Sequence, residues 1–202
     1  MSMLKVLAGF VPWFVFGLVA TREGAGAVTT AAWLAFVVAA ALVVVSLVRG
    51  GSPKVLEVAG AVVFAAFGVT GALVPAADGF LSDYGTSLAT LLLAVVIFAL
   101  LPVMPFTEQY ARETVPQQYW NSPVFRSVNR RISAAWGAVI AVMGVSNAAA
   151  GLVPELPTTL PTRPVDLALN WVVPALLIWW AVRYTRRVSS EAGDHASAAH
   201  RV

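Results

Sequence analysis

The sequence predicts an all-α, polytopic membrane protein: one bundle of six transmembrane helices with both termini in the cytoplasm. Three observations support this prediction. Hydrophobic residues make up 59% of the 202 residues and charged residues only 11%, less than half of the roughly 25% that is usual in soluble domains. Long apolar runs recur along the chain, and the basic residues fall almost entirely on one side of the topology that these runs define. A soluble domain of this length could not bury so much apolar surface, because small domains have a large surface for their volume.

Six apolar stretches approach the roughly 20 residues that a helix needs to cross the hydrocarbon core of a bilayer. The runs do not alternate between apolar and polar residues, as the strands of a transmembrane barrel do. We expect the first stretch to be a retained helix and not a cleaved signal peptide, because Leu18 stands where cleavage requires a small residue. In chain order, the stretches are Leu4–Ala20, Val28–Val48, Val55–Val74, Leu88–Val103, Ile132–Val153 and Val165–Val182.

The basic residues predict the orientation of these spans. Six spans leave only Arg22 and Arg163 on one side of the membrane and eleven basic residues on the other. Cytoplasmic loops are enriched in Lys and Arg, so the second side is expected to be cytoplasmic. This sidedness also explains the net charge of +3 without a nucleic-acid partner. The eleven residues are Lys5, Arg49, Lys54, Arg112, Arg126, Arg130, Arg131, Arg183, Arg186, Arg187 and Arg201.

Residues 105–131 form the longest expected cytoplasmic connection and combine aromatic with basic side chains, as segments at a membrane interface do. Thr107 is expected to cap a short helix over residues 108–114, and Ser122 to cap a helix that begins at Pro123 and continues into the fifth span. Glu108 and Arg112 stand at the i, i+4 spacing that predicts an ion pair on a helix surface. A solvated basic patch is one interpretation of this segment. The alternative is a surface that binds anionic headgroups or partners through Tyr110, Arg112, Tyr119, Trp120, Arg126, Asn129, Arg130 and Arg131.

The domain organisation expected from these features is simple. Residues 1–188 form the transmembrane domain, and residues 189–202 are small and polar, which predicts a disordered tail. The third and fifth spans carry small residues four positions apart, a spacing that lets helix backbones approach closely. We therefore expect these two helices at the centre of the bundle. The pairs are Ala61/Ala65, Gly68/Ala72, Gly137/Ala141 and Gly144/Ala148.

Few ionisable side chains are expected at membrane depth, where they would mark function. Glu57 is expected near the start of the third span, where it either pairs with Lys54 or handles protons or cations on the cytoplasmic side. Asn147 is the most deeply placed polar side chain, and an interhelical hydrogen bond explains it more simply than a ligand contact. The chain has no cysteine, and both histidines lie in the last ten residues, so no metal or cofactor is expected. If the protein is an enzyme, its candidate acids are Glu57, Glu108 and Glu113, each of which would need an apolar cavity to raise its pKa.

One stretch of the chain carries Phe125, Asn129, Ile132, Trp136, Met143, Gly144 and Asn147. This pattern resembles the stretch that runs into a late span of the intracellular septation protein A family, which consists of small polytopic inner-membrane proteins of bacteria. The chain departs from the family in its longer connection after Pro105 and in its Ala/Val-rich spans. The resemblance implies a scaffold of the bacterial plasma membrane that serves envelope maintenance or division, and it supplies no active site.

The sequence therefore favours a non-enzymatic protein that organises envelope or division partners through residues 105–131. Its expected partners are anionic lipid headgroups and either other membrane proteins or a second copy of the chain. A transporter or channel for small solutes or lipids is one alternative, because Pro12, Pro102 and Pro174 could break spans as transporter helices are broken. An intramembrane enzyme that acts on an isoprenoid or lipid is the other.

Overall fold

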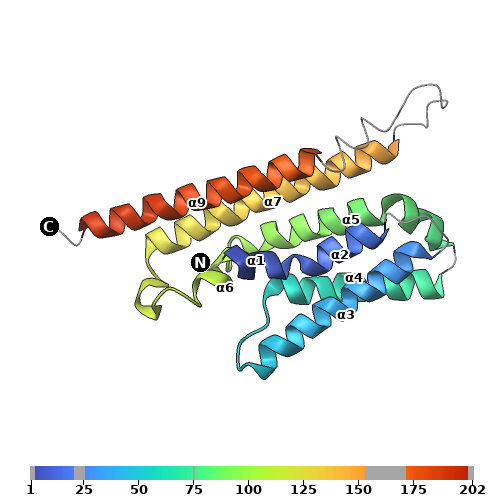
Figure 1. Ribbon diagram of the computed structural model, residues 1–202, viewed down its shortest axis with the longest axis horizontal. Coiled ribbons are helices and arrows are strands. Elements are labelled where there is room, and N and C mark those ends of the chain that lie inside the picture. Colours follow the sequence, from blue (N-terminus) through green and yellow to red (C-terminus); the bar gives the residue numbers. More distant parts are fainter. Residues whose placement is uncertain (1–2, 21–25, 75, 153–171, 200–202) are drawn as a thin grey trace.

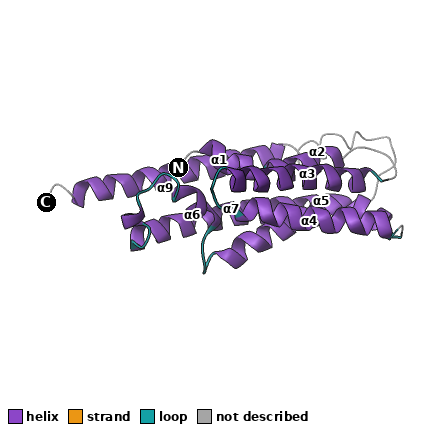
Figure 2. Ribbon diagram, turned by 90° about the horizontal axis from the view of Figure 1, so that it is seen from below, coloured by secondary structure: helices purple, strands orange, loops and turns teal. Residues whose placement is uncertain are grey.

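The computed structural model describes residues 3–20, 26–74, 76–152 and 172–199, and these residues form helices and loops without a strand (Figure 2). Four of the helices are long and apolar enough to cross a membrane, which confirms the prediction of a helical membrane protein. They are α3 (Ala27–Val48), α4 (Val55–Leu73), α5 (Ala77–Leu100) and α7 (Pro123–Leu152). The long helices α5, α7 and α9 (Val173–Ala199) run close to one long axis, and α3 is inclined to it (Figure 1).

The first expected span consists of two helices, α1 (Met3–Gly9) and α2 (Val11–Ala20). The chain breaks at Phe10, whose carbonyl accepts the backbone N–H groups of Trp13 and Phe14 at 3.0 and 3.1 Å. Pro12 explains the position of the break, because proline has no N–H to donate and its ring clashes with the carbonyl of the preceding turn.

The signals that start α7 are local, and here the sequence prediction is confirmed. α7 begins at Pro123, and the Ser122 hydroxyl accepts the backbone N–H of Phe125 at 3.1 Å. Serine before proline is a favoured start of a helix, because the hydroxyl satisfies an N–H that has no partner within the helix and proline has none to satisfy.

α5 begins at Ala77, well before the expected start at Leu88. Leu81, Gly85 and Ala89 recur every four residues along its first half and are all buried. A Cβ added at Gly85 would lie 3.2 Å from a methyl group of Val28, so this half of α5 packs closely on α3. Packing against a neighbour thus extends the helix through a stretch whose serines and acidic residues weaken the apolar pattern.

The last described helix, α9 (Val173–Ala199), contains the second half of the expected sixth span. Residues 165–171 of that span lie outside the described residues. The helix also includes residues 189–199, where the sequence predicted disorder. Arg187 and Glu191 form an ion pair of 2.9 Å at the i, i+4 spacing, which favours continued helix.

The centre of the bundle differs from the prediction. α5 packs against α2, α3, α4 and α7, and it lies between α4 and α7, the pair that we expected at the centre. The predicted small residues do allow close approach, but α4 and α7 each approach a different neighbour and not each other. An added Cβ would lie 2.7 Å from the Trp33 ring at Gly68 and 2.8 Å from Leu91 at Gly144. α4 therefore approaches α3 at Gly68, and α7 approaches α5 at Gly144, because small-residue spacing identifies a close contact without identifying the partner.

Two apolar clusters fill the interior. One surrounds Phe16 and Phe64, whose ring centres lie 5.0 Å apart, where α2, α3 and α4 meet. The other joins α1, α5, α7 and α9 around Phe10 and Trp136. Large apolar side chains also remain on the outside, among them Val37 and Val95, which are 60% and 61% exposed. An apolar exterior of this kind suits helices that face lipid.

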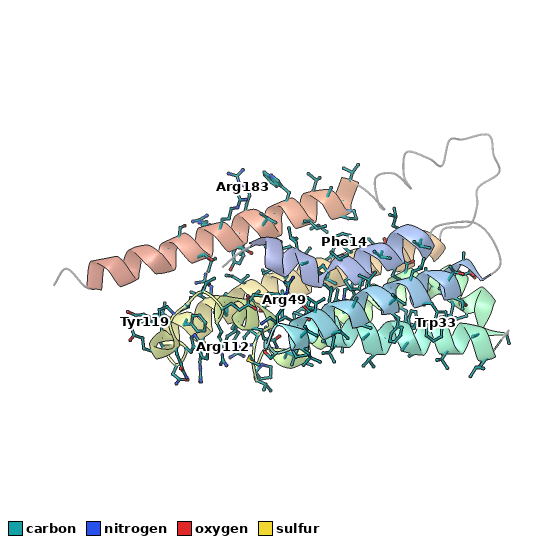
Figure 3. All side chains as sticks on the ribbon, turned by 60° about the horizontal axis from the view of Figure 1, so that its bottom comes forward. Phe14, Trp33, Arg49, Arg112, Tyr119 and Arg183 are labelled. Carbon is teal, nitrogen blue, oxygen red and sulfur yellow. The ribbon has the colours of Figure 1, made fainter. Side chains whose placement is uncertain are left out.

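The connections gather at two ends of the bundle. The α3–α4 turn, the segment between α5 and α7, and the last turns of α9 lie at one end, whereas the end of α2 and the start of α5 lie at the other (Figure 1). We call the first of these the basic end, because it holds Arg49, Lys54, Arg112, Arg126, Arg130 and Arg131. Figure 3 shows Arg49, Arg112 and Tyr119 toward this end and Trp33 toward the other.

Candidate functional site

A short helix, α6 (Phe106–Ala111), closes the basic end. The Phe106 side chain is fully buried and meets the ring of Phe10 edge-on, with ring centres 5.9 Å apart. Phe10 in turn stacks on Trp136 of α7 at 5.5 Å. Phe106 thus fills the space between α1 and α7.

Thr107 joins α6 to α7 and does not cap a helix, so the predicted cap is wrong. α6 begins at Phe106, and the Thr107 hydroxyl donates to the backbone carbonyl of Asn129 at 3.0 Å. The Ser133 hydroxyl lies 2.8 Å from the Thr107 hydroxyl and accepts the Thr107 backbone N–H at 3.3 Å. Thr107 and Ser133 are completely buried, which makes these bonds costly to lose without replacement.

Lys54 and Gln109 connect α6 to the α3–α4 turn. The Lys54 ammonium lies 2.6 Å from the Glu113 carboxylate and donates to the Gln109 carbonyl at 3.4 Å. The Gln109 side-chain oxygen accepts the backbone N–H of Val55 at 2.9 Å, which satisfies a donor in the first turn of α4. The start of α4 is therefore held by the segment that follows α5.

Glu57 is buried, and its contacts differ from the expected ion pair with Lys54. Its carboxylate accepts the backbone N–H of Lys54 at 3.1 Å and the Ser46 hydroxyl at 3.2 Å. The contact with Lys54 is thus to the backbone, whereas the ammonium of Lys54 bonds to Glu113. Glu57 satisfies a backbone donor at the start of α4, where a negative charge also interacts favourably with the helix dipole.

Glu108 and Arg112 form the ion pair that their i, i+4 spacing predicted. Arg112 Nη2 lies 2.6 Å from Glu108 Oε1, and Arg112 Nε donates to the same oxygen at 3.1 Å. The Arg112 guanidinium also lies 4.9 Å from the centre of the Trp120 ring, and the indole N–H of Trp120 donates to the Val115 carbonyl at 2.8 Å. These contacts fold residues 112–120 back onto α6.

Tyr110 is buried beside Gly9, and its hydroxyl has no hydrogen-bond partner among the described residues. A Cβ at Gly9 would collide with this hydroxyl, so glycine is needed there for α1 to pass. Burial raises the pKa of Tyr110 well above its usual range, and the charges of Glu57 and Glu113 raise this pKa further. Two of the three candidate acids therefore disfavour ionisation of the same phenol.

The predicted binding residues divide into a buried and an accessible group. Tyr110 and Asn129 are each 3% exposed, and the Asn129 side chain donates to the Phe125 carbonyl at 2.8 Å. These two side chains stabilise the fold and do not reach a partner. Arg112 and Trp120 are half-buried. The accessible group consists of Tyr119, Arg126, Arg130 and Arg131.

The remaining candidates lie elsewhere. Asn147 is half-buried in α7 toward the end opposite the site. No group of three side chains that could hold a metal ion occurs within the described ranges. Sequence reasoning missed Gln109 and Ser133, although a serine inside an apolar run was a signal for an interhelical hydrogen bond.

Comparison of the chain with protein-family models, with curated proteins and with solved structures gives no match. The resemblance to the intracellular septation protein A family therefore stays a prediction, carried by the residues that suggested it.

Replacing Tyr110 with phenylalanine tests the geometry of this site. Tyr110→Phe removes a buried hydroxyl without a partner, so the free energy of unfolding should rise by about 1 kcal/mol at neutral pH. Above pH about 10, the ordinary pKa of tyrosine, the wild type should lose stability as pH rises, because the unfolded chain ionises Tyr110 while the fold keeps it protonated. The advantage of the variant should therefore widen there. Denaturant unfolding in micelles at several pH values measures both effects.

Tyr119→Phe is the matched control, because Tyr119 is 42% exposed and should change stability little at either pH. A loss of stability in Tyr110→Phe at neutral pH would show that the hydroxyl has a bonding partner, contrary to the structure.

Proposed function

We propose that this protein is a non-enzymatic membrane scaffold with six spans, whose basic end lies in the cytoplasm and docks partner proteins. The observation that carries the proposal is the contrast at this end between a fixed base and an open rim. The base is α6, held by Thr107 and Phe106. The rim consists of the accessible side chains of Tyr119, Arg126 and Arg130.

The six-span topology is supported by the distribution of charge. Basic residues from the α3–α4 turn, from the α6–α7 connection and from the start of α7 all lie at one end. An excess of Lys and Arg of this kind is typical of the cytoplasmic side. α1 and α2 together would supply the first span, and residues 165–182 the sixth.

The contacts of the carboxylates favour a scaffold over an enzyme. Glu57 bonds to backbone and serine, Glu108 to Arg112, and Glu113 to Lys54. Each therefore fixes local structure, whereas an acid catalyst must exchange its proton with a substrate. The resemblance to the intracellular septation protein A family supports a place in the bacterial plasma membrane and a role in the cell envelope or division.

The topology is testable with single cysteines, because the chain has none of its own. Gln118→Cys at the basic end and Gly79→Cys at the other end both replace exposed residues. In intact bacterial cells, a membrane-impermeant maleimide should label Gly79→Cys and should label Gln118→Cys only after the membrane is opened. The reverse pattern would place the basic end outside, and labelling of both sites in intact cells would contradict an odd number of crossings between them.

Partner docking is testable by charge reversal on the rim. Arg126→Glu combined with Arg130→Glu should abolish most of the protein partners that co-purify with the wild type after crosslinking in cells. The physical reason is that opposite charge at an interface rim repels a partner selected for complementarity. Insertion into the membrane should be unchanged, because both side chains are exposed.

Arg183→Glu combined with Arg186→Glu changes the net charge equally but on α9, where Figure 3 shows Arg183 on the outer side of the helix. This control should retain the partners. If the rim variant also retains every partner and its cellular position, docking does not occur at this surface.

A further inference from the structure

An open groove of about 380 Å³ runs between the first turns of α7 and the outer part of α9. Its apolar lining consists of Pro123, Val124, Val128 and Val188. Its polar lining consists of Ser127, Arg131 and Glu191. The groove therefore offers an apolar surface next to a small number of charged and hydroxyl groups.

The charges around the groove favour an anion. Ser127 and Arg131 stand one turn apart and so project from the same face of α7. Glu191 is bonded to Arg187 at 2.9 Å, which offsets its negative charge. The N-terminal end of α7, at Pro123, adds the partial positive charge of the helix dipole. The Arg131 guanidinium is exposed and lies beside the apolar lining.

The register of α7 and α9 places the groove next to an aromatic band. The indole N–H of Trp136 donates to the Thr185 hydroxyl at 3.1 Å, so these two residues lie at one level. Trp180 stacks on Tyr184 with ring centres 5.3 Å apart, and such aromatic side chains are typical of the boundary between hydrocarbon and headgroups. Arg131 lies about 7 Å along α7 from Trp136, toward the basic end. This is the depth at which lipid phosphates are expected.

We propose that the α7–α9 groove binds one anionic phospholipid at the cytoplasmic surface. The phosphate contacts the Arg131 guanidinium and the Ser127 hydroxyl, and the glycerol region packs on Val124 and Val128. A phospholipid supplies an apolar body and a negative group in the same molecule, which is the combination that this lining complements. The proposal rests on the membrane placement of the basic end in the proposed function, but it does not rest on protein docking at the rim.

Adjacent arginines provide a matched comparison. Arg130 and Arg131 carry the same charge and are both exposed, but only Arg131 lines the groove. The full-length protein in micelles is titrated with phosphatidylglycerol or with phosphatidylcholine, and bound lipid is counted by native mass spectrometry. Arg131→Gln should weaken phosphatidylglycerol binding about fivefold, the effect of one arginine near an anionic headgroup. Arg130→Gln should weaken it less than twofold, and phosphatidylcholine should bind weakly to all three proteins.

Filling the groove without changing charge provides a second test. Val124→Trp, at a groove residue that is 56% exposed, should reduce phosphatidylglycerol binding although every arginine is retained. Equal losses in Arg130→Gln and Arg131→Gln would show diffuse attraction to a basic surface and would overturn the proposal, as would unchanged binding in Val124→Trp. Equal binding of the two lipids would overturn it as well.

Competition with inorganic phosphate tests whether the groove binds a phospholipid or a free phosphate ion. A large excess should not displace phosphatidylglycerol, because free phosphate lacks the apolar body that the groove contacts. Displacement that depends on Arg131 would indicate a free-anion site and would overturn the lipid proposal. Loss of protein partners in the rim variant with lipid binding retained would separate the two proposals, because docking is assigned to Arg126 and Arg130.

Discussion

The hydroxyl of Thr107 joins α6 to α7 inside the basic end, where it donates to the Asn129 carbonyl and meets the Ser133 hydroxyl. Hydrogen bonds in such a buried position are costly to break because neither group can turn to water. Phe106, beside it, packs on Phe10 and so holds α1 against α7. Farther along the same segment, Glu113 and Gln109 hold the start of α4. α6 and the residues that directly follow it therefore connect three parts of the bundle that lie far apart in the sequence.

The polar side chains at the basic end therefore fall into two groups: those that are bonded or buried within the fold, and those that remain accessible. The carboxylates bond to groups at helix starts and to neighbouring basic side chains, the Tyr110 ring is buried, and the Asn129 amide bonds to the Phe125 carbonyl of its own helix. The arginines of α7 remain accessible and lie on two faces. Arg126 and Arg130 stand four residues apart on one face, and Ser127 and Arg131 stand on the next, about 100° around the helix. A protein partner and a lipid could therefore use neighbouring surfaces of α7 without competing for the same side chains.

Local signals predicted local structure well. Ser122 and Pro123 identified the start of α7, and the spacing of Glu108 and Arg112 identified their ion pair, because these interactions involve residues within one or two turns. Long-range packing was not predictable in the same way. The partner of Thr107 comes from α7, the early start of α5 depends on contact with α3, and the burial of Tyr110 depends on Gly9. Six spans and their orientation stay a prediction from the apolar runs and the basic residues.

Hydrogen exchange of the backbone amides of α6 tests the central claim most directly. If α6 is locked into the bundle, the amides of Glu108 to Ala111 should exchange slowly, at rates near those of the adjoining part of α7, whereas residues 117–121 should exchange rapidly. Thr107→Val should accelerate exchange in α6 without affecting the α3–α4 contact region around Ala39 and Gly60. Exchange in α6 as rapid as in residues 117–121 would contradict the account, because α6 would then not be fixed in the bundle.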